Sequence, residues 1–305
     1  MKVLIATEKP FAAAAVKQMK EIIEASGAEL ILLEKYESKS QLLETVKDVN
    51  AIIVRSDIID AEVIDAAKDL KIIVRAGAGY DNIDLDSATK HNVVVMNTPG
   101  QNANAVAEMI FGLLILMARN NYDGSAGIEL KNKTFGLHAF GNVAKNVARI
   151  AKGFDMKVYA FDPFLTPEQI MAEGVSPVEK IEDLYKTCQY VSLHIPATPQ
   201  TIKSINYDLL SLMPKGATLI NTARKEVIDE AGLLKLMADR NDFTYISDVK
   251  PAKYEEFISD YSDRVFFTPK KMGAQTKEAN VNAGLAAATQ VVDYLYKGID
   301  KFKLN

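Results

Sequence analysis

The segment Thr134-Phe-Gly-Leu-His-Ala-Phe-Gly141-Asn-Val-Ala144 is the clearest indication of the architecture of this chain. Its beginning predicts a β-strand, its middle a tight turn and its end the start of an α-helix. Only the middle glycine of the dinucleotide-binding pattern Gly-x-Gly-x-x-Gly is present, as Gly141, where a pyrophosphate approaches the backbone. Ala139 replaces the first glycine and Ala144 the third. The glycine pattern alone leaves a dinucleotide site and an ordinary strand–turn–helix connection open.

An acidic residue follows the next apolar run at the spacing that a dinucleotide site requires. The run Lys157–Phe161 is followed by Asp162, which lies 21 residues after Gly141. A carboxylate there would bind the ribose hydroxyls of an adenosine and repel the 2′-phosphate of NADP. The alternative is a helix-capping aspartate in a plain βαβ unit. The combined spacing favours an NAD site formed by Phe140, Gly141, Asn142, Val143 and Asp162.

Short apolar runs alternate with helix-length stretches along the whole chain. The runs are almost continuously apolar, which is typical of parallel strands covered on both faces. The pattern therefore predicts an α/β protein built from doubly wound parallel sheets. Four of the intervening stretches are amphipathic helix candidates: Phe11–Ser26, Ser40–Val49, Asp60–Leu70 and Asn142–Phe154. The predicted strands are Lys2–Ala6, Ala51–Arg55, Lys71–Arg75, Val93–Asn97, Thr134–Ala139, Lys157–Phe161, Tyr190–His194, Thr218–Asn221, Phe243–Ser247 and Val265–Phe267.

The length of 305 residues suggests two domains. We expect one from residues 1–97 together with 277–305, because the helical segment Lys277–Tyr296 can return to the first set of strands, and one from residues 98–276. Between the two sets of strands lies Asn102–Arg119, which is apolar around nearly its whole circumference. Such a helix is either buried inside one chain or packs partly against a second subunit.

Composition excludes several classes of protein. The net charge of −4 disfavours a general nucleic-acid binder. The longest apolar helical candidate has only ten uncharged residues, Met109–Ala118, which is too short to span a membrane. Cys188 is the single cysteine, so no intramolecular disulfide forms and a reducing cytoplasm is expected. The three histidines and Cys188 are far apart in sequence and form no zinc-type pattern.

Five further motifs stand in order along the chain, and together they resemble the D-isomer-specific 2-hydroxyacid dehydrogenases. The resemblance covers nearly the whole chain. It implies two Rossmann-like domains, a smaller one for substrate and a central one for NAD, with the active site in the cleft between them and a homodimer formed through the nucleotide domain. The motifs are Arg75-Ala-Gly-Ala-Gly-Tyr-Asp-Asn-Ile-Asp84, Asn97-Thr-Pro99 followed by Ala105-Val-Ala-Glu108, Val191-Ser-Leu-His-Ile-Pro196, Asn221-Thr-Ala-Arg224 and Ser247-Asp-Val249.

The same resemblance assigns roles to residues at the ends of the predicted strands. The backbone amides of Ala76 and Gly77 would hold the substrate carboxylate, and Arg224 would bind the carboxylate and the carbonyl oxygen. Asp248 would hydrogen-bond the nicotinamide carboxamide. The remaining cofactor contacts expected on this side are His194, Pro196, Asn221, Thr222, Ala223 and Gly273.

Arg55 and Arg75 each end an apolar strand, where an arginine either seals the strand with a salt bridge or binds an anion. Two at adjacent strand ends suit a phosphate, with Ser56 and Lys271 contributing. Together, Val54-Arg55-Ser56 and Arg75-Ala-Gly77 most resemble the branch of the family that oxidises D-3-phosphoglycerate to 3-phosphohydroxypyruvate with NAD, the first step of serine biosynthesis. Asn102 is either the cap of the long apolar helix or a substrate contact.

Two departures from the family pattern concern the acid/base. Thr268-Pro269-Lys270 stands where the family has Thr-Pro-His, and no glutamate follows Asp248-Val249 at the usual spacing, although Glu255 and Glu256 are nearby. We expect Lys270 to be the acid/base, which requires burial and positive neighbours such as Arg224 or Lys271. Two alternatives stay open: a glyoxylate or hydroxypyruvate reductase, and a protein that binds NAD without catalysis.

Overall fold

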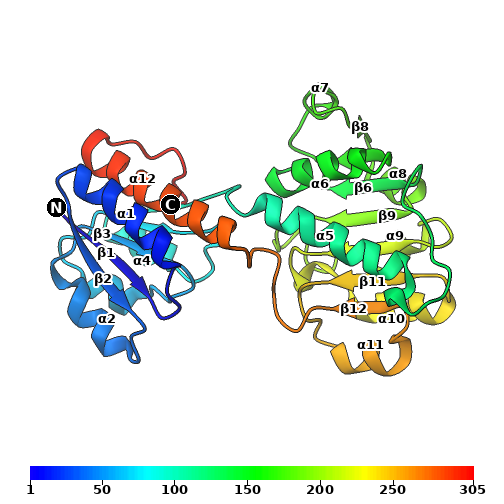
Figure 1. Ribbon diagram of the computed structural model, residues 1–305, viewed down its shortest axis with the longest axis horizontal. Helices are drawn as coiled ribbons and strands as arrows, with labels where there is room; N and C mark the ends of the chain where they lie inside the picture. Colours follow the sequence, from blue (N-terminus) through cyan, green and yellow to red (C-terminus); the bar gives the residue numbers. More distant parts are fainter. The chain divides into compact units, whose positions relative to one another are not determined.

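The computed structural model describes residues 1–305 and divides into two compact units, Met1–Asn102 with Gln275–Asn305 and Ala103–Ala274 (Figure 1). Each unit contains one fully parallel sheet with helices on both faces, which confirms the predicted fold class. The chain passes from the first unit to the second after Asn102, whereas the sequence analysis expects this boundary after residue 97. The segment that follows β5 stays with the first sheet, because the amide of Thr98 donates to Gly77 O at 2.9 Å.

The sheet of the first unit has the strand order β2-β1-β3-β4-β5. Its core strand β3 is buried along its whole length. Helices α1 (Ala13–Ala25) and α12 (Lys277–Lys297) pack on one face, and α2 (Lys39–Thr45), α3 (Ala61–Ala66) and α4 (Leu85–Lys90) pack on the other. The strands are β1 (Lys2–Thr7), β2 (Glu29–Glu34), β3 (Ala51–Val54), β4 (Ile72–Arg75) and β5 (Val94–Asn97).

The last residues of the chain pair with the edge strand of this sheet. Leu304 donates its amide to Val95 O at 2.9 Å, and the side chain of Asn305 accepts the Val95 amide at 2.8 Å. Lys303 forms an antiparallel bridge with Met96. The free edge of β5 is therefore covered by the segment that follows α12.

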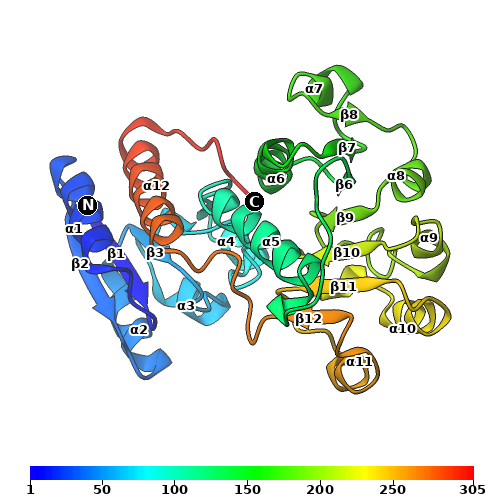
Figure 2. The same ribbon diagram turned by 45° about the vertical axis from the view of Figure 1, so that its right-hand side comes forward.

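The sheet of the second unit has the order β12-β11-β10-β9-β6-β7-β8. Helices α5 (Ala103–Ala118) and α6 (Asn142–Gly153) cover one face, and α8 (Ile181–Thr187), α9 (Tyr207–Ser211) and α10 (Glu230–Asp239) the other (Figure 2). Two further helices lie in connections between strands: α7 (Pro167–Met171) between β7 and β8, and α11 (Tyr254–Tyr261) between β11 and β12. The strands are β6 (Thr134–His138), β7 (Lys157–Phe161), β8 (Ser176–Pro177), β9 (Tyr190–Leu193), β10 (Thr218–Asn221), β11 (Thr244–Ser247) and β12 (Val265–Phe267).

All ten predicted runs form strands, but the sequence analysis does not predict β2 and β8. Strand β2 is an edge strand whose residues are half-buried or exposed, so it lacks the long apolar run of the core strands. Strand β8 has only two residues. Helix α5 also differs from a helix buried all round, because Gly112 is exposed and Ile115 to Ala118 are only half-buried.

The strand order reverses once in each sheet, between β1 and β3 and between β6 and β9. In open α/β sheets, ligands bind beyond the carboxyl ends of the strands at such a switch point. This rule selects two loop pairs. They are the segments after β1 and β3 in the first unit, and the segments after β6 and β9 in the second.

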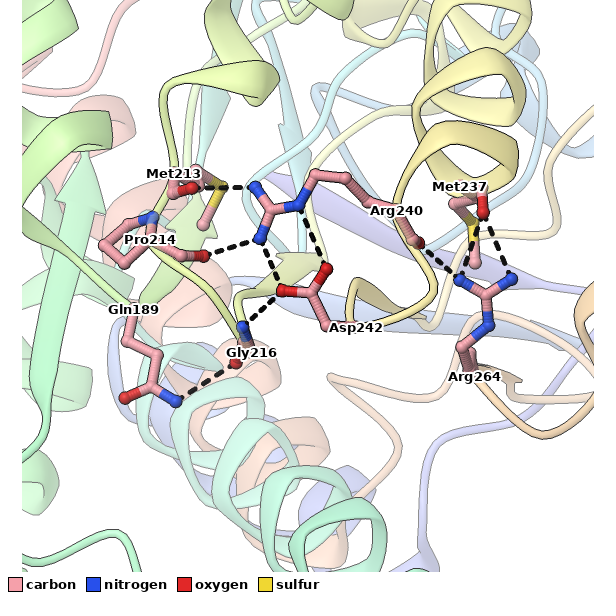
Figure 3. A network of polar contacts seen from close by, with 8 residues as sticks. All are labelled: Gln189, Met213, Pro214, Gly216, Met237, Arg240, Asp242 and Arg264. Atoms are coloured by element: carbon pink, nitrogen blue, oxygen red, sulfur yellow. Dashed lines mark hydrogen bonds and ion pairs between the residues drawn. The ribbon is translucent and has the colours of Figure 1, made fainter.

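At the amino ends of the strands of the second sheet, opposite the switch point, a polar network around Arg240 joins the loops (Figure 3). Arg240 donates to the carbonyls of Met213 and Pro214, both at 2.7 Å, and pairs with Asp242, whose pKa it holds well below the usual range. Asp242 also accepts the amide of Gly216 at 2.6 Å. Gln189, Met237 and Arg264 extend the network. These hydrogen bonds fix the loops that precede the strands, at the end of the sheet opposite the switch point.

The turn after β6 contains an alanine in left-handed backbone conformation, since Ala139 has φ of +74°. This conformation costs a non-glycine residue about 1–2 kcal/mol. Glycine adopts this conformation without that strain, but it loses about 0.5–1 kcal/mol more chain entropy on folding, which offsets part of the gain. We expect Ala139→Gly to raise the free energy of unfolding by about 0.5 kcal/mol, measured from urea midpoints.

The matched control is Ala144→Gly, because Ala144 is fully buried in the first turns of helix α6. There the same substitution should destabilise the protein by about 1 kcal/mol or more, since glycine is a poor helix former. Equal effects of the two substitutions would contradict the assignment of strain to Ala139.

Candidate functional site

The amino end of helix α6 offers unused amide donors at the switch point of the second unit. Gly141 is the N-cap residue, and a Cβ placed on it would meet no atom within 4 Å. The amides of Asn142, Val143 and Ala144 make no hydrogen bond to a protein acceptor. Open amides and the helix dipole together favour an anion at this position. A pyrophosphate fits this cradle.

Asp162 stands at the end of β7, beside this turn. Its Oδ2 accepts the amide of Phe140 at 2.8 Å and its Oδ1 accepts the amide of Phe164 at 2.9 Å. Each carboxylate oxygen retains a second acceptor position for a hydroxyl. Phe140 itself differs from the expected cofactor contact, because its side chain is fully buried in the core and its amide is held by Asp162.

A cavity of about 430 Å³ adjoins Asp162. Its wall comes from β7, α7, β8 and their connections and is mostly apolar, which suits the faces of a flat heteroaromatic ring. The lining side chains include Phe161, Pro163, Leu165, Ile170 and Val178. The second unit thus presents an anion cradle, a carboxylate and an apolar cavity in sequence along one edge of its sheet.

The loop after β10 is held by the buried side chain of Asn221. Its Nδ2 donates to Arg224 O and its Oδ1 accepts the amide of Ala223, both at 3.0 Å. The Ala223 carbonyl in turn accepts from Arg224 Nη1 at 3.1 Å and from Lys271 Nζ at 3.2 Å. Asn221 therefore acts on the conformation of the loop, and Arg224 and Lys271 meet at one carbonyl beside Thr222.

Asp248 lies beyond β11 and has one oxygen without a partner. Oδ2 accepts the amides of Gly273 at 2.8 Å and Met272 at 3.3 Å, whereas Oδ1 is buried and makes no hydrogen bond. Burial raises the pKa of the Asp248 carboxyl, an effect that the amides and Lys271 oppose. A buried orphan acceptor needs a donor. Gly273 is required for close approach, since a Cβ there would lie 3.0 Å from Asp248 Oδ2.

Two histidines lie where strands end at the switch point, His138 as the last residue of β6 and His194 directly after β9, and both are neutral near pH 7. Burial lowers the pKa of His138 to about 4 and that of His194 to about 3. His138 Nδ1 lies 3.1 Å from the hydroxyl of Tyr185, and the Nε2 of His194 is buried without a partner. Neither ring carries the charge that an acid catalyst would need at neutral pH. Pro196, in the same loop, is exposed.

Lys270 is exposed, which differs from the burial expected of a lysine base. Its carbonyl accepts a hydrogen bond from the Thr268 hydroxyl at 2.7 Å, and this bond fixes the backbone of the Thr-Pro-Lys turn. Lys271 is exposed as well, but its Nζ is held at the Ala223 carbonyl. Glu256 pairs with Lys253 at 2.7 Å, so it is engaged away from this turn.

In the first unit, Arg55 bridges the switch point between β1 and β3. Its Nη1 donates to the carbonyls of Lys9 at 3.1 Å and Pro10 at 3.2 Å, and its Nη2 donates to Asn280 Oδ1 at 2.5 Å. The guanidinium also lies over the ring of Phe11, 5.2 Å from its centroid. All of these partners are uncharged, so the positive charge of Arg55 is positioned without being neutralised by them.

Arg75 lies at the end of the neighbouring strand β4, and its side chain is oriented by the backbone of Arg55. Its Nε donates to Arg55 O at 2.9 Å. Its guanidinium then lies across Gly77, where a Cβ would come within 1.5 Å of Arg75 Nη1. Gly77 also has φ of +151°, so this position needs glycine both for its backbone and for the arginine above it.

The amides expected to hold the substrate carboxylate are already occupied. The Ala76 amide donates to Val54 O at 2.8 Å, and the Gly77 amide bonds a carbonyl two residues back at 2.9 Å. The expectation is wrong for these two donors, because the β-ladder and a tight turn consume them. The amides of Ala78 and Gly79 make no hydrogen bond to a protein acceptor and are the donors available in this loop.

Sequence reasoning missed two residues that organise Arg55. Buried Asp57 accepts the Glu8 amide at 2.7 Å, the Tyr36 hydroxyl at 2.9 Å and the Arg55 amide at 3.3 Å. A carboxylate directly after an apolar strand was the available signal. Asn280 gave none, since it lies 225 residues from Arg55 in sequence.

The remaining predicted residues lie at the borders of these loops. Ser56 is exposed next to Arg55, and Asn102 is half-buried immediately before α5. No group of three or more His, Cys, Asp or Glu side chains is arranged to hold a metal ion. No helix combines the length and the hydropathy that a membrane crossing would need.

Comparisons with known proteins agree with this geometry. Residues 107–270, more than half of the chain, match the family described as D-isomer specific 2-hydroxyacid dehydrogenase, NAD binding domain. The chain is 35% identical to a D-3-phosphoglycerate dehydrogenase of Methanocaldococcus jannaschii over 83% of its own length and 51% of the relative. It is 33% identical to a hydroxypyruvate reductase of Thermotoga maritima over 88% of its length and 91% of the relative.

Among solved structures, an NAD⁺-bound 3-phosphoglycerate dehydrogenase of Entamoeba histolytica is 47% identical, with a TM-score of 0.89 over 100% of this chain and 98% of that chain. The chain spans about half the length of several curated relatives named D-3-phosphoglycerate dehydrogenase. The family match and the relative from Thermotoga maritima, which the alignment covers almost completely, lead to one assignment. The chain belongs to the D-isomer-specific 2-hydroxyacid dehydrogenase family.

Proposed function

We propose that the protein catalyses the NAD-dependent oxidation of D-3-phosphoglycerate at C2, giving 3-phosphohydroxypyruvate, NADH and a proton. The observation that carries the choice of substrate is the setting of Arg55. Its guanidinium is fixed at the switch point of the first unit by neutral partners only, with Arg75 attached to its carbonyl. A positioned cation whose guanidinium has no carboxylate among its hydrogen-bond partners suits a phosphate.

The residues of the second unit fit NAD. The amides at the start of α6 suit the pyrophosphate, Asp162 the ribose hydroxyls, and the orphan Oδ1 of Asp248 the carboxamide NH₂. When bound, the cofactor accepts the hydride that leaves C2 of the substrate. Arg224 would bind the substrate carboxylate and stabilise charge on the C2 oxygen, and Asn221 holds the loop that carries it.

The carboxylate of Asp162 should set the choice of cofactor. We expect the protein to prefer NAD over NADP, because the negative charge repels a 2′-phosphate. Asp162→Ala should narrow this preference by weakening NAD binding more than NADP binding, as measured by titrating both reduced cofactors. Glu179→Ala removes a charge from the same cavity wall and should leave the ratio of the two affinities unchanged. Comparable affinity of the unaltered protein for both cofactors would refute the role given to Asp162.

Arg55 should discriminate between phosphorylated and unphosphorylated substrates. Loss of a charged hydrogen bond costs about 1.5–3 kcal/mol, which corresponds to roughly a tenfold to hundredfold change in affinity. Arg55→Ala should therefore raise KM for phosphohydroxypyruvate by that factor and leave turnover of hydroxypyruvate nearly unchanged. Equal losses on both substrates would show that Arg55 serves only the fold through Lys9 and Pro10.

A second candidate function is reduction of hydroxypyruvate, favoured by the nearly full-length match to the Thermotoga maritima reductase. A reductase of this kind has no phosphate to bind, so the Arg55 experiment separates the two functions. Side-by-side NADH oxidation assays with phosphohydroxypyruvate, hydroxypyruvate and glyoxylate give the substrate directly. A protein that binds NADH and turns over none of the three would contradict both functions.

We also propose Lys270 as the group that exchanges the proton of the C2 hydroxyl, because it occupies the position of the family histidine. Lys271, held at the Ala223 carbonyl, supports the Arg224 loop. Lys270→Met keeps the side-chain length and removes the exchangeable proton, so kcat should fall by roughly a hundredfold or more. Lys271→Met is the control and should act mainly on KM. The reverse result would make Lys271 the acid/base, and two active variants would place the proton transfer outside this turn.

We further propose that a second copy of the chain covers helix α5. Gly112 is exposed on this helix, Leu116 one turn later is half-buried, and the following segment exposes Tyr122 by 63% and Ile128 by 50%. Apolar surface of this kind on a regular helix is typical of a subunit interface.

Gly112→Arg tests this interface without disturbing the isolated chain. A Cβ on Gly112 would meet no atom within 4 Å, and the substitution improves helix propensity. We expect a dimer to become a monomer, as measured by light scattering after size exclusion. Gly153→Arg, at an equally open position on α6, should leave the dimer intact. An unchanged mass for Gly112→Arg would exclude α5 from the interface.

A further inference from the structure

The side chain of Asn280, near the start of α12, is held in one orientation. Its Nδ2 donates to the Thr276 carbonyl at 2.7 Å, and its Oδ1 accepts from Arg55 Nη2 at 2.5 Å. A carbonyl can only accept and a guanidinium can only donate, so the reversed amide would satisfy neither contact. Asn280 therefore presents a fixed neutral acceptor to Arg55.

Three hydrogen bonds use part of the donor capacity of Arg55. A guanidinium has five N–H donors, and here Lys9 O, Pro10 O and Asn280 Oδ1 take one each. The Nε–H and one Nη2–H remain for another acceptor. Half-buried Arg55 is thus oriented on two sides and left with two directed donors at the switch point.

The neutrality of this acceptor is chemically important. A carboxylate at position 280 would bind the guanidinium more strongly, but it would also cancel the charge and repel an incoming phosphate. Asp57, the nearby carboxylate in the same loop, bonds the Arg55 backbone amide and is committed to Glu8 and Tyr36. The Asp57 charge attracts Arg55 electrostatically, but the groups in direct contact with the guanidinium are carbonyls, an amide oxygen and the Phe11 ring.

We propose that Asn280 is a positioning residue that determines specificity for a phosphorylated substrate by aiming Arg55 without neutralising it. The inference rests on the proposed function, since it assigns the phosphate to Arg55. It adds that recognition requires a neutral amide from the carboxy-terminal helix, far from Arg55 in sequence. The negative charge of the substrate phosphate then meets a guanidinium whose hydrogen-bond partners within the protein are all uncharged.

The test compares Asn280→Asp and Asn280→Ala with phosphohydroxypyruvate and hydroxypyruvate as substrates. We expect Asn280→Asp to raise KM for the phosphorylated substrate at least tenfold, and Asn280→Ala severalfold. For both variants, kcat and the kinetics with hydroxypyruvate should stay within about twofold of the unaltered protein. The control is Asn282→Asp, which adds the same charge to an exposed position of the same helix and should change neither KM by more than twofold.

A direct binding measurement accompanies the kinetics. Inorganic phosphate should raise the melting temperature of the unaltered protein and of Asn282→Asp, and this increase should be lost in Asn280→Asp. Equal behaviour of Asn280→Asp and Asn282→Asp, or an equal rise of KM for both substrates, would overturn the inference. If Arg55→Ala discriminates between the substrates while the Asn280 variants do not, only this inference fails. If Arg55→Ala does not discriminate, the proposed phosphate site fails with it.

Discussion

Where a parallel strand ends and a loop begins, the backbone amides of the loop lose their partners in the sheet and need other acceptors. In this protein, aspartate side chains are the acceptors at three such places. Asp57, Asp162 and Asp248 each follow a strand and each accept at least two amides of the surrounding loops. A carboxylate is suited to this task because its two oxygens have several acceptor positions. These carboxylates also retain unused acceptor positions, and Oδ1 of Asp248 is buried without any hydrogen-bond partner.

Arg240 and Arg55 have similar backbone contacts but differ in the charge of their side-chain partners. Arg240 and Arg55 both donate to two backbone carbonyls near strand ends. Arg240 also forms an ion pair with Asp242 at 2.7 Å, so its charge is neutralised within the network at the amino ends of the strands. Arg55 has a neutral amide in the corresponding place. Sequence alone does not distinguish the two, because each arginine has an aspartate two positions later.

The sequence predicts the fold well because burial on both faces produces apolar runs that only parallel strands explain. It also places the Gly141 turn and Asp162, because the distance between them is set by one helix and one strand. It fails for β2, whose edge position removes the apolar signal, and for the Ala76 and Gly77 amides, since hydrogen-bond occupancy is not visible in residue types.

Long-range contacts and exposure account for the other differences at the site. The contact between Arg55 and Asn280 joins residues 225 positions apart, and no local pattern reports it. The exposure of Lys270 likewise depends on how the Thr-Pro-Lys turn leaves β12, which its sequence does not encode. The positions predicted correctly are those for which a single supersecondary unit fixes the geometry.

The pairing of Lys303–Asn305 with β5 has a consequence for self-association. An uncovered edge strand is a template on which other chains can add strands and aggregate. Here the backbone and the Asn305 side chain occupy that template, so intermolecular strand addition to this sheet is confined to β2. Strand β2 carries Glu29 and Glu34 at its two ends, and these like charges oppose the stacking of identical strands. The first unit is therefore protected from cross-β growth at both of its edges by different means.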